Sequence, residues 1–294
     1  MRQTTVANRV ESVGIGLHKG EPIEIILEPI EANQGIVFYR SDTGTSIKAS
    51  PSNVVNTSNA TVIGSNRNNI STIEHLLSAI YSYGIDNILI TLNGAEVPVM
   101  DGSGASFCMM LDQAQKRELD ENKSVLIIKR EVEVIDGKKF ARVKPSKNPS
   151  YKFEIDFPHP IIGKQSYKFK FSKKAYIKEI SKARTFGFLK DVQYLQSRGL
   201  ALGGSLDNAI VLDDKKILNP SGLRFKDEFV KHKILDAIGD LALLGSPVLA
   251  DYESFAGSHN LNHLLTKEIL KDPKNYEIRD FAMVEGLEYS KAFA

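Results

Sequence analysis

The sequence predicts an α+β fold made of two similar domains, each a β-sheet layered against helices. Segments with strand-like alternation begin both halves of the chain, and helical apolar spacing recurs only a few times. Strands and helices do not alternate regularly, which favours α+β layers over a doubly wound parallel sheet. A length of 294 residues also exceeds that of a typical single domain.

The first strands are expected at Glu24–Leu27 and Gly35–Tyr39, separated by the turn-forming residues 31–34. Their spacing predicts antiparallel β-structure. Ile73–Tyr81 then has the apolar periodicity of an amphipathic helix, with the hydroxyls of Ser71 and Thr72 as its N-cap.

The first half continues with a predicted strand at Asn87–Leu92 and a loop at Val97–Gly104. That loop leads into a second helix over about Ala105–Lys116. The charged stretch Lys116–Lys123 follows, and we place the domain boundary there, giving domains 1–120 and 121–294.

The second half repeats this order of elements. Strands are predicted at Val125–Ile135 and Phe140–Val143, around the turn Asp136–Gly137. A helix is expected over about Glu228–Leu244. The repetition is the reason for expecting two similar domains.

Bulk charge and composition exclude several classes of protein. The net charge is +2, from 38 basic and 36 acidic side chains, so no global field would recruit nucleic acid or an anionic membrane. Cys108 is the single cysteine, the first residues lack the apolar core of a signal peptide, and no apolar run approaches the roughly 20 residues of a membrane span. We expect a cytoplasmic monomer that is not inserted in a membrane.

The chain has six histidines, so each of them can be considered individually as a metal ligand. His232 and Asp236 are four residues apart in a helical pattern, so both lie on one face and could bind one zinc ion. His75 could supply a third ligand, and Glu74 could then reach the water at the open position. The alternative is that His232 and Asp236 only form a surface hydrogen bond. Glu74 and His75 would then be a solvated pair at the start of their helix, where Glu74 complements the helix dipole.

His259 and His263 form a rival pair with the same spacing, which geometry alone does not distinguish from the first. Lys139 and Lys233 could meet phosphates, although most lysines only solvate a surface. Phe157 and Phe186 could stack on a nucleobase, although a phenylalanine near a strand end is usually core. The residues themselves leave these alternatives open.

Five blocks in a fixed order resemble the UDP-3-O-acyl-N-acetylglucosamine deacetylases, and the match runs nearly end to end. The blocks are Gly14–Gly20, Ser71–Leu76, Pro98–Ser103, Ala183–Phe188 and His232–Asp240. The resemblance implies an intracellular enzyme of Gram-negative lipid A synthesis with two similar α+β domains and an active site between them. It also favours the first histidine set over the rival pair.

The resemblance assigns roles to individual residues. It implies one catalytic Zn²⁺ ion held by His75, His232 and Asp236. Glu74 is then the base that activates the attacking water, and His259 is the general acid. The Thr185 hydroxyl and the protonated His259 would stabilise the oxyanion, and Asp240 would maintain the charge of His259.

The remaining implied roles concern the substrate. Lys233 and Lys139 resemble phosphate contacts, Phe157 the uracil-stacking aromatic, and Asp191 a residue near the nucleotide and sugar, with Phe186 a further candidate for stacking. Ala256 departs from the family, since many members have a basic residue there.

The segment from His159 to Gly163, with 166–171, fits the insert that accepts the acyl chain, or else an ordinary hairpin. The sequence thus predicts a zinc-dependent deacetylase. The alternatives are a zinc amidase for another acylated amino sugar and a catalytically silent nucleotide-sugar binding protein.

Overall fold

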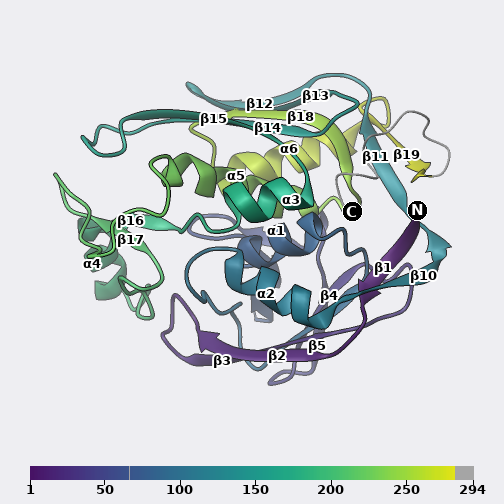
Figure 1. The fold of residues 1–294 in the computed structure, drawn as a ribbon, viewed down its shortest axis with the longest axis horizontal. Coiled ribbons are helices and arrows are strands. Elements are labelled where there is room, and N and C mark those ends of the chain that lie inside the picture. Colours follow the sequence, from purple (N-terminus) through teal and green to yellow (C-terminus); the bar gives the residue numbers. More distant parts are fainter. Residues whose placement is uncertain (66, 282–294) are drawn as a thin grey trace.

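The structure is a computed structural model that describes residues 1–65 and 67–281. Its α+β fold is the predicted one. Two sheets form the outer layers, and the main helices fill the space between them (Figure 1). The C-terminal residues 291–294, which from the sequence could be either a degradation signal or a frayed terminus, lie outside the described residues.

The first outer layer is a five-stranded sheet in the order β2-β3-β9-β4-β5. Buried residues alternate along β3, at Ile23, Ile25 and Leu27, as expected for a sheet with one face on the core. The strands are β2 (Val10–Ile15), β3 (Pro22–Glu28), β4 (Ile36–Arg40), β5 (Thr45–Lys48) and β9 (Ile88–Leu92).

The first two predicted strands run antiparallel to each other as expected, but they are not neighbours in the sheet. β3 and β4 do not pair with each other; both flank β9, to which β3 is antiparallel and β4 parallel. The parallel pairing follows because the chain between β4 and β9 contains a helix and crosses over the sheet. The sheet is therefore mixed.

The second outer layer is a seven-stranded sheet. Its path is β12-β13-β18-β11-β19, and β14 joins it beside β18 while β15 pairs only with β14. The predicted strand at 125–135 is divided into two. The strands are β11 (Ser124–Ile128), β12 (Val132–Asp136), β13 (Lys139–Pro145), β14 (Ser150–Asp156), β15 (Lys164–Lys170), β18 (Val248–Phe255) and β19 (Tyr276–Asp280).

Three of the helices between the sheets, α1, α2 and α5, agree with the predicted ones to within a few residues, and α6 was not predicted. α1 packs directly on α5, and this pair forms the centre of the molecule (Figure 1). The expected hydroxyl N-cap of the first helix is wrong, because Ile73 occupies that position and no side chain caps the helix. The helices are α1 (Glu74–Ser82), α2 (Ala105–Ala114), α5 (Glu228–Ala242) and α6 (His259–Lys271).

The charged stretch after the second helix is a strand. β10 (Lys116–Asn122) pairs with β1 (Arg2–Val6), at the edge where the chain passes to its second half. Only Leu119 is buried along β10, so its sequence has no apolar pattern to predict it. The boundary between residues 120 and 121 remains a prediction.

Short elements complete the described chain. Among these residues, no helix is both long enough and apolar enough to cross a membrane. The short elements are β6 (Val54–Asn56), β7 (Val62–Gly64), β8 (Asn69–Ile70), β16 (Phe186–Phe188), β17 (Ile210–Leu212), α3 (Lys173–Ala175), α4 (Leu189–Ser197), and turns of helix at Pro51–Asn53 and Tyr176–Ile180.

Candidate metal centre

The entry into α1 fixes the first two candidate residues. Thr72 has a left-handed backbone (φ 60°), and its hydroxyl donates to Glu96 Oε1 at 2.9 Å. A non-glycine residue held in this region marks a backbone constrained by its surroundings. The helix begins two residues later, so Glu74 and His75 lie side by side at its start, and both are buried.

Gly239 lets α5 approach α1 closely. A Cβ atom at this position would lie 2.0 Å from the backbone oxygen of Glu74, so only glycine allows this contact. The close approach brings His75 on α1 to His232 and Asp236 on α5.

The three side chains form one cluster. Asp236 Oδ1 lies 3.2 Å from His232 Nε2 and 3.6 Å from His75 Nε2. Tetrahedral zinc ligands, each about 2.0–2.2 Å from the ion, lie about 3.4 Å from one another, so the spacing fits one zinc ion. Asp236 Oδ1 is also buried and accepts no hydrogen bond from any described residue, as expected of an oxygen reserved for a cation.

Protonation states at the cluster also suit a metal. Burial lowers the pKa of His232 to about 3, although Asp236 opposes this, so the imidazole is neutral at pH 7. Its Nδ1 donates to the Ala183 carbonyl at 3.0 Å, which leaves Nε2 with a free lone pair. Burial would raise the pKa of Asp236, but its neighbours His232 and then the Lys233 ammonium, 2.8 Å away, hold that pKa well below its usual range.

A second chain of polar contacts lies beside the cluster. Glu74 Oε1 is 3.7 Å from His259 Nε2, and His259 Nδ1 is 2.9 Å from Asp240 Oδ2. Thr61 and Asn262 complete it, because the Thr61 hydroxyl and the Asn262 amide donate to Asp240, and the Thr61 amide donates to Glu74. These last two residues were not predicted.

The carboxylates control the charge of His259. Burial would lower its pKa, but Asp240 and then Glu74 raise it to about 10. His259 is thus a protonated donor at neutral pH. Burial raises the pKa of Glu74, and the charge of His259 opposes that rise. A carboxylate with a raised pKa is a stronger base.

Aromatic residues lie next to the cluster, and Thr185 precedes one of them, Phe186, in the chain. The Phe186 ring lies 6.5 Å from that of His232 and 5.8 Å from that of Phe157, and Lys233 Nζ lies 5.7 Å from its centre. The Thr185 amide donates to the Gly102 carbonyl at 2.8 Å, and the Thr185 hydroxyl makes no hydrogen bond within the described chain. That hydroxyl is free to meet a ligand.

Other predicted contacts lie outside this group. Lys139 is exposed at the start of β13, and Asp191 is exposed in the first turn of α4; neither forms an ion pair with a described residue. The segment 157–163 joins β14 and β15, so its hairpin form is established, and its role with an acyl chain remains a prediction. His263 and His259 belong to no group of three ligands within the described residues.

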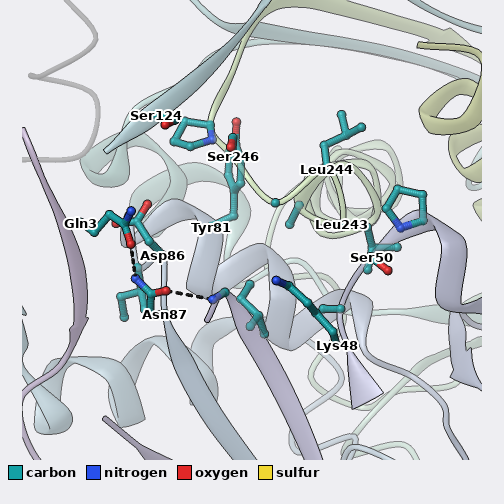
Figure 2. Close-up of a pocket in the computed structure, with 18 of the residues that line it drawn as sticks. Gln3, Lys48, Ser50, Tyr81, Asp86, Asn87, Ser124, Leu243, Leu244 and Ser246 are labelled. Carbon is teal, nitrogen blue, oxygen red and sulfur yellow. Dashed lines mark hydrogen bonds between the residues drawn. The ribbon is translucent and has the colours of Figure 1, made fainter. Parts of the chain in front are cut away.

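A cavity of about 500 Å³ lies away from the cluster, at the C-terminal ends of α1 and α5. Figure 2 shows that its polar wall is internally bonded: Asn87 Nδ2 donates to Gln3 Oε1, and Asn87 Oδ1 accepts from the Gly35 amide. Asp86 is paired with Lys123 at 3.0 Å. These contacts pair the side chains of Asn87 and Asp86 within the wall of the cavity.

Two imidazoles and a carboxylate around one point, beside a buried carboxylate–imidazole pair, define a metalloenzyme site of the hydrolase class. The comparisons with known proteins specify it further. A family model described as UDP-3-O-acyl N-acetylglycosamine deacetylase matches residues 3–271, and the chain belongs to this family.

Relatives named UDP-3-O-acyl-N-acetylglucosamine deacetylase are similar over the full length of both chains. Identity is 64% to the protein of Campylobacter fetus subsp. fetus, 61% to that of Campylobacter curvus and 63% to that of Campylobacter jejuni subsp. jejuni serotype O:23/36, each over 294 residues. The resemblance inferred from the five sequence blocks is thereby confirmed.

Proposed function

We propose that this protein is a zinc-dependent deacetylase. It hydrolyses the N-acetyl group of UDP-3-O-acyl-N-acetylglucosamine to give UDP-3-O-acyl-glucosamine and acetate, the committed step of lipid A biosynthesis, in the cytoplasm. The observation that carries this proposal is the buried His75, His232 and Asp236 cluster, with the Glu74–His259 pair beside it, in a chain of this family.

His75, His232 and Asp236 would hold the ion, with two neutral nitrogens and one ionised oxygen as donors. Zinc bound there would act as a Lewis acid and lower the pKa of a coordinated water toward about 7. Asp236 is buried, and its Oδ1 atom accepts no hydrogen bond from the described residues, which supports this assignment.

The chain's own residues would move the protons. Glu74 accepts a proton from the attacking water, because burial makes its carboxylate more basic than usual. The Thr185 hydroxyl donates a hydrogen bond to the oxygen that gains charge as the amide carbon becomes tetrahedral. His259 donates its Nε2 proton to the departing amine, and the carbon–nitrogen bond breaks.

Substrate contacts follow from the residues around the cluster. Phe157 and Phe186 offer aromatic faces for the uracil, and Lys139 and Lys233 offer charges for the phosphates. Lys233 already contacts Asp236 Oδ2, so it would have to serve both ligand and substrate. Asp191, at the start of α4, would lie near the nucleotide and sugar.

The test is turnover of UDP-3-O-acyl-N-acetylglucosamine by the purified protein, before chelation, after chelation and with zinc restored. Activity lost to the chelator and recovered with zinc is the expected result. Zinc-loaded protein with no turnover, across several acyl lengths and both ester and amide linkages, would contradict the proposal. Turnover of another acylated amino sugar in its place would favour the wider amidase alternative.

A further inference from the structure

A buried ion pair beside the candidate metal centre has no part in the proposed reaction. Glu228 is fully buried at the first position of α5, and Arg184 is 3% exposed. Arg184 Nε lies 2.9 Å from Glu228 Oε1, and its Nη2 donates to the Gly222 carbonyl at 2.8 Å. Removing two charges from water is costly, so such a pair calls for a reason.

The carboxylate of Glu228 also binds backbone. Its Oε1 accepts from the Arg184 amide at 3.0 Å, and its Oε2 accepts from the Arg224 amide at 2.6 Å. Glu228 thus ties the start of α5 to two separate segments of chain. Hydrogen bonds to an ionised acceptor are about twice as strong as neutral ones, so these segments are firmly held.

One peptide unit connects this ion pair to the metal centre. The Arg184 amide that donates to Glu228 and the Ala183 carbonyl that accepts from His232 belong to the same trans peptide. Glu228 and His232 are four residues apart on α5, which is about one helical turn, or about 5.4 Å along the helix axis. The peptide can therefore lie alongside this turn and form one hydrogen bond with each side chain.

We propose that Glu228 and Arg184 are positioning residues for the metal centre. They fix the Ala183–Arg184 peptide, and its carbonyl holds His232 with its proton on Nδ1 and its Nε2 directed to the ion. Metal-ligating histidines commonly donate to a carboxylate or carbonyl in this way. Here the carboxylate acts through an intervening peptide, and this inference rests on the proposed zinc site.

The test is the zinc affinity of full-length Glu228→Gln, measured by competition with a chromophoric chelator. A glutamine keeps one acceptor oxygen and loses the charge, so its NH₂ group must face either the Arg184 donors or the Arg224 amide, and the peptide is held less firmly. Loss of a partner that orients a ligand typically weakens metal binding by about 10- to 100-fold, and we expect that range. Arg184→Lys keeps the charge and the backbone amide, so this variant should retain part of the wild-type zinc affinity. It provides a second test if Glu228→Gln does not fold.

The matched control is Asp86→Asn, which breaks the partly buried ion pair with Lys123 at the far end of α1. It should lower stability but leave zinc affinity unchanged within about twofold, since no bond connects Asp86 to a ligand. Cobalt substitution adds a readout of ligand geometry: the visible spectrum should change in Glu228→Gln and not in Asp86→Asn.

The outcomes separate the two proposals. A wild-type protein that binds no zinc would contradict the proposed function itself. A wild-type protein that binds zinc, together with a Glu228→Gln protein of the same affinity and the same cobalt spectrum, would overturn the positioning role alone.

Discussion

Replacing Asp240 by asparagine removes one charge from the site and little else. Oδ2 of Asp240 accepts from His259 Nδ1 at 2.9 Å and from Asn262 Nδ2 at 2.8 Å, and Oδ1 accepts from the Thr61 hydroxyl. An asparagine can keep its carbonyl oxygen toward the first two donors. Its NH₂ then faces Thr61, whose hydroxyl can reverse and accept. The Asp240→Asn substitution therefore isolates the effect of charge.

The expected effect is a large fall in the pKa of His259. In the metal-free wild type, Asp240 and Glu74 hold that pKa at about 10 against the effect of burial. Opposite charges about 4 Å apart attract by about 4 kcal/mol at an effective dielectric constant of about 20. Since about 1.4 kcal/mol corresponds to one pKa unit, the pKa should fall by about 3 and come close to 7.

The assay is an NMR titration of the imidazole resonances in metal-free protein labelled with ¹⁵N-histidine. Asp86→Asn is the control, because it removes a partly buried carboxylate charge at the far end of α1. His259 should titrate near pH 7 in Asp240→Asn and near its wild-type value in Asp86→Asn. An unchanged titration in Asp240→Asn would refute the argument that Asp240 keeps His259 charged.

Three further predictions concern the cluster and the helix pair. Glu74→Ala should retain zinc but lose about 10²- to 10⁴-fold in kcat, whereas His232→Ala should lose zinc; full zinc by metal analysis in His232→Ala would refute that ligand. Gly239→Ala should cost about 1–3 kcal/mol in urea unfolding, because its Cβ meets a backbone oxygen, although alanine normally favours a helix; a stabilised protein would contradict the packing argument. The stabilisation of the metal-free protein by His259 should be complete below its ordinary pKa of 6.5 and disappear as pH rises through about 10. Urea unfolding across that range should show this decline in the wild type and a shallower one in His259→Ala.

Local periodicity predicted the parts of the fold that local physics determines. α1 and α5 each carry apolar residues at helical spacing, and the sequence locates both to within a few residues, although the fold buries nearly the whole circumference of each helix. β10 was not predicted, because it is held by hydrogen bonds to β1 at the other end of the first half. Pairing with a distant strand produces no regular alternation of apolar residues in the sequence of β10 itself.

The residues of the candidate site likewise divide into those that the sequence indicates and those that only the fold brings together. Spacing places His232 and Asp236 on one helical face, and the family resemblance supplies His75 and Glu74. Thr61 gave no signal, because its role depends on contact with Asp240, which only the fold brings near. The contact between Asn262 and Asp240 likewise joins two helices. Contacts of this kind follow from the packing of α1, α5 and α6 rather than from any local pattern.

The division of the proposed metal ligands between α1 and α5 has a consequence for synthesis of the chain. His75 emerges from the ribosome long before His232 and Asp236, so the first half alone presents one ligand of three. A lone histidine holds zinc poorly, so at the proposed site the ion would be retained only after α5 has packed on α1. Metal retention therefore reports that both halves have been made and have assembled, and a truncated chain would compete little for cellular zinc.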